Sequence, residues 1–127
     1  MESRPKTLAE VAVRVSRGAL FLMELADFLD EFREQPGEAA FAEEPPALGT
    51  ETPERRWIDA YLAAVAEMLS GQQGWRSPGW VRKPERYLAD PSFAGRSREM
   101  RLFLLKDSPA AFKSRNLFVT GNALDRV

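Results

Sequence analysis

The feature that most constrains the fold is a helix-start signal that occurs twice, each time ahead of a long helical apolar pattern. Thr7 with Glu10 has the spacing of a capping box, in which the hydroxyl accepts from the third helical amide and the carboxylate reaches back to the cap. Thr52 with Pro53 puts a capping residue before the position where proline loses no helical hydrogen bond. Apolar residues then recur at three- and four-residue intervals, which indicates one buried helical face. The chain is therefore expected to be all-α.

Residues 7–34 and 52–70 are expected to be helical, with a loop over residues 35–51 between them. Residues 7–34 predict one long helix or a helix pair, with Gly18 either ending the first helix or lying inside a single one as a weak point. The apolar set of the second part is Leu22, Leu25, Ala26, Leu29 and Phe32, with Phe21 and Phe28 as a second line. Residues 35–51 predict a loop with one turn at most over 39–42, because tandem prolines forbid regular helix hydrogen bonding.

The helix expected over residues 52–70 should end at Gly71 or Gly74. Its predicted buried face is Trp57, Ile58, Tyr61, Leu62, Val65, Met68 and Leu69. Beyond it, residues 75–127 predict short helices and loops between Pro78, Pro84, Pro91 and Pro109.

The short helices of this second half are expected over residues 84–89, 97–106 and 110–116, the last capped by Ser108. The apolar side of the middle one is Met100, Phe103, Leu104 and Leu105. Residues 117–119 favour β structure but are too short to make a sheet alone. The whole chain therefore predicts one domain: a compact bundle of about five helices with an irregular, proline-rich C-terminal half.

Composition limits the chemistry that this chain can carry out. With 127 residues and 44% hydrophobic content it can bury a core without disulfides or metal. It has no Cys and no His, which removes thiolate nucleophiles, the usual zinc ligands and the commonest general base. Its paired carboxylates lack the spacing of a calcium loop, and its glycines do not form a phosphate-binding loop. No catalytic residue, metal or cofactor is therefore expected, and the protein is not expected to be an enzyme.

No membrane or export segment is expected. The longest apolar run, residues 18–29, is broken by Glu24 and Asp27 and is shorter than the roughly 20 residues of a membrane span. The N-terminal residues show no apolar segment of a secretory signal. A cytoplasmic location without membrane contact is the default expectation.

The net charge of −1 hides a strong asymmetry along the chain. Residues 1–70 hold 7 Lys/Arg against 14 Asp/Glu, whereas residues 71–127 hold 11 against 5. The two halves either compensate each other within one domain or face different partners, of which nucleic acid is one possibility for the basic half.

The basic half contains the main candidate binding residues. Arg98 and Arg101 are three residues apart on one expected helix and so share a face, and Lys113 and Arg115 lie on the next. These side chains either bind phosphates or carboxylates of a partner or pair internally with the acidic half. The expected helix over 97–106 is mostly apolar, unlike a helix that reads DNA bases.

Trp75 and Trp80 lie in a connection rich in Pro and Gly, whereas Trp57 belongs to the core by its periodicity. Large rings in such a connection either seal the end of a small core or anchor a binding interface. Both interpretations remain open for Trp80.

The second half of the chain resembles a family of short bacterial proteins whose genes often neighbour one for a nucleotidyltransferase-like protein. The resemblance covers mainly residues 57–124 and is carried by WV at 80–81, PERYL at 84–88, PSF at 91–93, SPAAFKSRNLFV at 108–119 and NAL at 122–124. The arrangement is similar to toxin–antitoxin and other two-gene modules, in which the small member binds the enzyme and restrains or assists it. No catalytic residue follows from this resemblance.

Two functions of different classes are thus predicted. The first is a non-enzymatic, antitoxin-like partner that docks on a cognate nucleotidyltransferase-type enzyme encoded by a neighbouring gene. The alternative is a nucleic-acid-binding regulator that uses the basic C-terminal half. The predicted partner-binding residues are Trp80, Arg98, Arg101, Lys113, Arg115 and Asn116.

Overall fold

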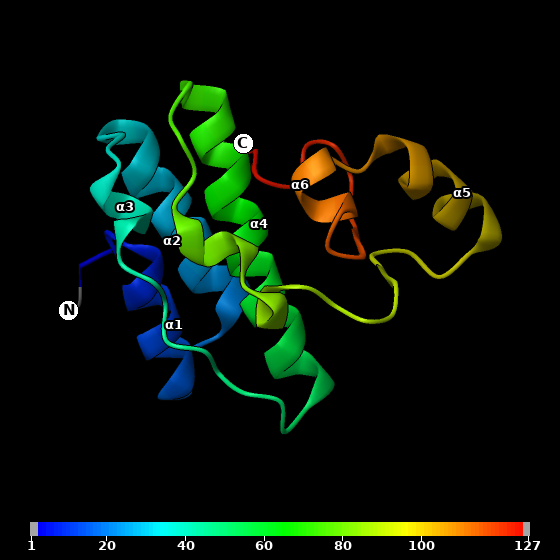
Figure 1. Cartoon of the computed structure of the whole chain (residues 1–127), viewed down its shortest axis with the longest axis horizontal. Helices are drawn as coiled ribbons and strands as arrows, with labels where there is room; N and C mark the ends of the chain where they lie inside the picture. Colours follow the sequence, from blue (N-terminus) through cyan, green and yellow to red (C-terminus); the bar gives the residue numbers. More distant parts are fainter. Residues whose placement is uncertain (1–2, 126–127) are drawn as a thin grey trace.

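One long helix, α4 (Pro53–Gln73), forms the axis of the structure (Figure 1). This computed structural model describes residues 3–125. The hydroxyl of Thr52 accepts a hydrogen bond of 3.1 Å from the amide of Arg55, as the sequence predicts for its start. Gly74 ends the helix with a φ of 75°, a left-handed conformation that glycine adopts without steric penalty. The all-α prediction is confirmed, and of the two glycines expected to end this helix, Gly74 is the one that does so.

The middle of α4 is covered on more than one side. Ala60, Ala63 and Ala64 are fully buried, and such small side chains allow neighbouring elements to approach the helix closely. Tyr61 shows the arrangement: its ring meets Phe21 edge-on at 5.5 Å and Phe112 at 4.9 Å between centroids. Phe21 belongs to the N-terminal part of the chain and Phe112 to the C-terminal part. The two parts therefore both pack against α4, which lies between them.

The N-terminal part is a helix pair, α1 (Leu8–Ser16) and α2 (Phe21–Glu34). Thr7 caps α1 by accepting from the amide of Glu10 at 3.0 Å, while the Glu10 carboxylate accepts from the amide of Lys6, one residue before the cap. Gly18, with a φ of 106°, makes the break between the helices. The expected pair is confirmed, with Gly18 outside both helices.

The core face of α2 differs by one position from the predicted one. Its buried residues are Phe21, Leu25, Phe28, Leu29 and Phe32. Leu22, predicted to be buried, is instead 62% exposed. Phe21 packs against Trp57 and Tyr61 of α4, so the side of α2 that carries Phe21 faces the core and Leu22, one position on, lies outside.

The connection between α2 and α4 is irregular apart from one short turn of helix, α3 (Ala39–Ala42), as predicted. Its last part is fixed by Asp59 of α4, which is 4% exposed. The Asp59 carboxylate accepts hydrogen bonds from the amides of Leu48 at 2.9 Å and Gly49 at 3.3 Å. A buried carboxylate is thus matched by backbone donors, and the proline-rich loop is held against α4.

The C-terminal part consists of short elements. In chain order they are η1 (Gly79–Arg82), η2 (Pro84–Arg86), β1 (Ser92–Phe93), α5 (Arg98–Asp107), α6 (Ala110–Lys113) and β2 (Leu117–Phe118). β1 and β2 pair in parallel, with Ser92 opposite Leu117, so the β-favouring run finds its partner in the earlier PSF segment. Figure 1 shows α5 at the outer end of this part, away from α1–α4.

Three local predictions for this part need correction. The helix expected over 84–89 is a single 3₁₀ turn, and the one expected over 110–116 ends at Lys113. Ser108 does not cap α6, because its hydroxyl lies 2.6 Å from the carbonyl oxygen of Leu104 and 2.9 Å from that of Val119. Ser108 therefore closes α5 and joins it to the strand end, and Pro109 precedes α6 without a side-chain cap.

Within residues 3–125, no helix combines the length and the apolar character that a membrane crossing needs.

Burial of Tyr61 gives a prediction for alkaline unfolding. Burial raises the pKa of Tyr61 from 10.0 to about 12. Above pH 10 the unfolded chain therefore releases this proton while the folded chain retains it, so stability falls as the pH rises, by at most roughly 3 kcal/mol at pH 12. Tyr61→Phe should flatten this part of the loss in urea melts taken between neutral pH and pH 12.

The matched control is Tyr87→Phe, since Tyr87 is the chain's other tyrosine and is 37% exposed. It should keep the alkaline slope of the parent protein. Equal slopes for all three proteins would contradict the assignment of this loss to Tyr61.

Candidate protein-binding surface

Arg115 is fully buried and holds three elements together. Its guanidinium donates to the carbonyl of Ala111 at 2.7 Å, to the carbonyl of Val81 at 2.8 Å and to the carboxylate of Glu67 at 2.9 Å. It also lies 4.7 Å from the ring centroid of Tyr87. Both terminal nitrogens of the guanidinium are thus matched by acceptors, whereas its Nε has no hydrogen-bond partner within residues 3–125. Arg115 therefore joins α6, η1 and α4 inside the fold.

Trp80 is 7% exposed and has internal partners as well. Its indole Nε1 donates to the carbonyl of Phe41 at 2.9 Å, and the guanidinium carbon of Arg86 lies 5.0 Å from its ring centroid. Of the two interpretations left open by the sequence, the structure supports the ring that seals the core. Trp75, half-buried, packs beside it against Phe32 and Phe41.

These two placements correct the predicted partner-binding set. The folded chain offers neither the Trp80 ring nor the Arg115 guanidinium to a partner, because both are already enclosed by the chain itself. Asn116 is half-buried, and its amide donates to the carbonyl of Leu88 at 2.8 Å. With a φ of 64° it makes the turn between α6 and β2, a conformation that asparagine tolerates better than most residues.

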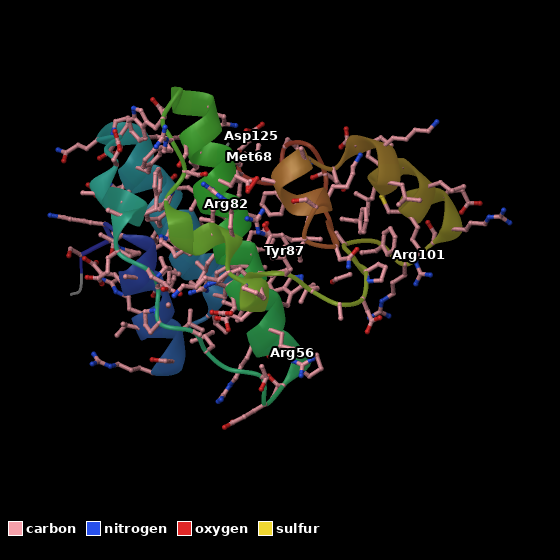
Figure 2. All side chains as sticks on the ribbon, in the orientation of Figure 1. Arg56, Met68, Arg82, Tyr87, Arg101 and Asp125 are labelled. Atoms are coloured by element: carbon pink, nitrogen blue, oxygen red, sulfur yellow. The ribbon has the colours of Figure 1, made fainter. Side chains whose placement is uncertain are left out.

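The other three predicted residues are exposed. Lys113 ends α6, while Arg98 and Arg101 lie on the first turns of α5. The guanidinium carbon of Arg101 lies 5.6 Å from the Phe93 ring centroid, and Figure 2 shows Arg101 on the outer part of the C-terminal region, apart from the labelled residues of α4. The predicted site is therefore divided: one part is internal, and the exposed part is centred on α5.

Most of the large apolar side chains of α5 are exposed to solvent. Only Leu104 is buried on this helix. Four neighbours are exposed: Met100 at 40%, Leu102 at 53%, Phe103 at 51% and Leu105 at 44%. We call Leu102, Phe103 and Leu105, together with the cations Arg98 and Lys106, the α5 surface. Arg98 and Lys106 have no ion-pair or hydrogen-bond partner within residues 3–125.

The sequence predicted one apolar side of this helix formed by Met100, Phe103, Leu104 and Leu105, and only Leu104 is buried, so the prediction is wrong for the other three. Successive helical residues are about 100° apart, so the continuous run 102–105 spreads around most of the helix circumference. A helix with a single packed side cannot bury such a run, and α5 packs its inner side against β2. This unbroken run was the signal in the sequence that pointed to an exposed apolar surface.

A second buried arginine, Arg86, was not anticipated. Its guanidinium donates to the carbonyls of Pro45 at 2.6 Å and Asp59 at 3.2 Å and pairs with Glu44 at 3.2 Å. The hydrogen bond from Lys83 is the main cause that lowers the pKa of Glu44, with Arg86 adding to it. No sequence pattern distinguishes Arg86 from exposed arginines, because its burial depends on the loop folded over it.

Residues 3–125 contain no group of three or more Asp and Glu side chains placed to hold a metal ion. Family models, curated proteins and solved structures give no match to this chain.

The internal role of Arg115 predicts a large stability difference between neighbours. Arg115→Ala should destabilise the fold by at least about 3 kcal/mol, because two buried carbonyls lose their donor and Glu67 loses its cation. Lys113→Ala, an exposed change two residues away, should stay within about 0.5 kcal/mol of the parent. Urea unfolding followed by circular dichroism measures both. Similar small losses at the two positions would show that Arg115 is not a structural link.

Proposed function

We propose that this protein is a non-enzymatic binding partner of another protein, antitoxin-like, and that the α5 surface is its docking element. The observation that supports this is the exposure of Leu102, Phe103 and Leu105 on a helix at the periphery of the fold (Figure 1). Contiguous exposed apolar patches on small proteins commonly mark interaction sites. A helix that presents leucine and phenylalanine beside cations fits an apolar groove with acidic edges on the partner.

The partner class in this proposal comes from the family resemblance, which names a nucleotidyltransferase-like enzyme encoded by a neighbouring gene. The cations of α5 are available to pair with carboxylates of a protein partner. The side chains of Arg98 and Lys106 form no ion pair within residues 3–125, so a partner carboxylate gains an ion pair without breaking one that the structure shows. Aromatic and arginine side chains are also the types that contribute most to protein interfaces.

The alternative, nucleic-acid binding by the basic half, has weaker support. Arg96, Arg98, Arg101 and Lys106 lie on or beside α5 and are exposed or half-exposed, as phosphate contacts require. However, apolar side chains occupy much of the exposed surface of the same helix, where a DNA-reading helix would present polar groups to the bases.

Replacing two leucines of the α5 surface tests the proposed docking. Leu102→Gln with Leu105→Gln keeps charge and helix propensity while removing apolar area. Binding to the purified protein of the neighbouring gene, measured by calorimetry, should weaken by at least about tenfold, because each buried leucine contributes roughly 1.5–3 kcal/mol. The matched control, Leu20→Gln with Leu22→Gln, changes two leucines of similar exposure at the α1–α2 turn and should not weaken this binding.

Binding that survives the α5 change unaltered would contradict the docking role of α5. If the neighbouring protein does not bind at all, while duplex DNA binds with a steep salt dependence that Arg98→Gln with Lys106→Gln reduces, the nucleic-acid alternative is correct.

A further inference from the structure

A second exposed apolar region lies at the turn between α1 and α2. Leu20 is 67%, Leu22 62% and Met23 64% exposed. Within residues 3–125, eight large apolar side chains are exposed, and all but Tyr87 belong either to this region or to α5. The apolar surface left uncovered by folding is therefore concentrated at two places, one in each half of the chain.

The region at the α1–α2 turn is hollowed rather than flat. A cavity of about 300 Å³ is lined by Leu20, Leu22, Met23, Trp57, Ile58 and Glu54. A neighbouring cavity of about 600 Å³ shares Leu20, Glu54 and Ile58 with it and continues toward Pro46 and Leu48. The two form one groove, which we call the corner groove, between the start of α2 and the start of α4. Large apolar side chains fit such a groove when they project from a helix.

The charges beside the two apolar regions are opposite. Glu54 lines the corner groove, and Asp27 lies one helical turn beyond Met23 on α2. Both carboxylates lack an ion-pair or hydrogen-bond partner within the described part of the chain, as do Arg98 and Lys106 of the α5 surface. The α5 surface also carries the exposed carboxylate of Glu99, one turn before Leu102 and Phe103, and Arg55 at the corner groove is paired with Glu51. The α5 surface is therefore net positive and the corner groove net negative, so their net charges are opposite.

We infer that the protein binds a second copy of itself by seating the α5 surface of one copy in the corner groove of the other. A closed, two-fold pair makes this contact twice and covers both apolar regions of each copy, which is the commonest arrangement of identical subunits. Burial of Leu102, Phe103 and Leu105 supplies the main driving force, and the opposite net charges of the two surfaces favour this orientation. Because α5 is also the proposed docking element, self-association and partner binding exclude each other.

Self-association is measured on the purified chain alone, by sedimentation velocity over a wide concentration series. The parent protein should be a dimer that dissociates on dilution. Leu102→Gln with Leu105→Gln and, separately, Leu20→Gln with Leu22→Gln should each raise the dissociation constant at least about tenfold. Leu20→Gln with Leu22→Gln should weaken the dimer but leave binding to the neighbouring protein intact. Failure of this inference therefore shows in the sedimentation data alone, whereas failure of the proposed function shows in the partner-binding data.

Mixing the two variants gives a further check, because the groove of one and the α5 surface of the other are intact. The mixture should form a heterodimer through one restored contact, at a dissociation constant between those of the parent and of each variant. A parent chain that stays monomeric at every concentration overturns the inference. So does a dimer that is insensitive to the change in either surface.

Charge reversal tests the orientation without altering apolar area. Asp27→Lys with Glu54→Lys should weaken the dimer several-fold, since like charges then face each other. Adding Arg98→Glu with Lys106→Glu in the same chain should restore it. The control Glu38→Lys with Glu43→Lys makes the same change in net charge at exposed carboxylates elsewhere and should leave the dimer unchanged. Absence of restoration in a chain with unaltered circular dichroism would overturn the proposed pairing of the two surfaces.

Discussion

The two buried arginines are the interactions on which the rest of the structure depends. Arg86 and Arg115 both come from the irregular second half, and both are fully enclosed. Each donates to two backbone carbonyls as well as to a carboxylate that retains about a third of its side-chain exposure. A buried guanidinium with several acceptors is tolerated, whereas the same group without them would carry a large desolvation penalty. Segments without long helices are thereby fixed against α4.

These arginines also explain the charge asymmetry of the chain. Part of the basic half is used internally, since Arg86 meets Glu44 and Arg115 meets Glu67 across the boundary between the halves. Another part remains outside on α5, where the side chains of Arg98 and Lys106 form no ion pair within residues 3–125. Internal compensation therefore accounts for part of the asymmetry, and the cations of α5 that remain exposed give that helix a net positive charge.

The candidate site could be predicted only in part. Arg98, Arg101 and Lys113 are exposed, as binding requires, because charged side chains on short helices stay in water unless something is folded over them. Trp80 and Arg115 were included among the partner-binding residues while an internal role stayed open for each, and the structure shows the internal role. Phe103 and Leu105 were predicted to share one apolar side with Leu104, but periodicity states which residues share a face and not whether a neighbour covers that face.

The sequence by itself determined the helices that local chemistry encodes. Thr7, Gly18, Thr52 with Pro53, and Gly74 mark starts and ends through hydrogen bonds and backbone angles that involve only nearby residues. The tertiary structure alone decided the rest: that Pro84–Arg86 is a single tight turn, that Ser92 pairs with Leu117, and that Arg115 lies inside while Leu102 lies outside. Those outcomes depend on which distant segments supply acceptors and apolar cover, and such long-range contacts leave no periodic signal in the sequence.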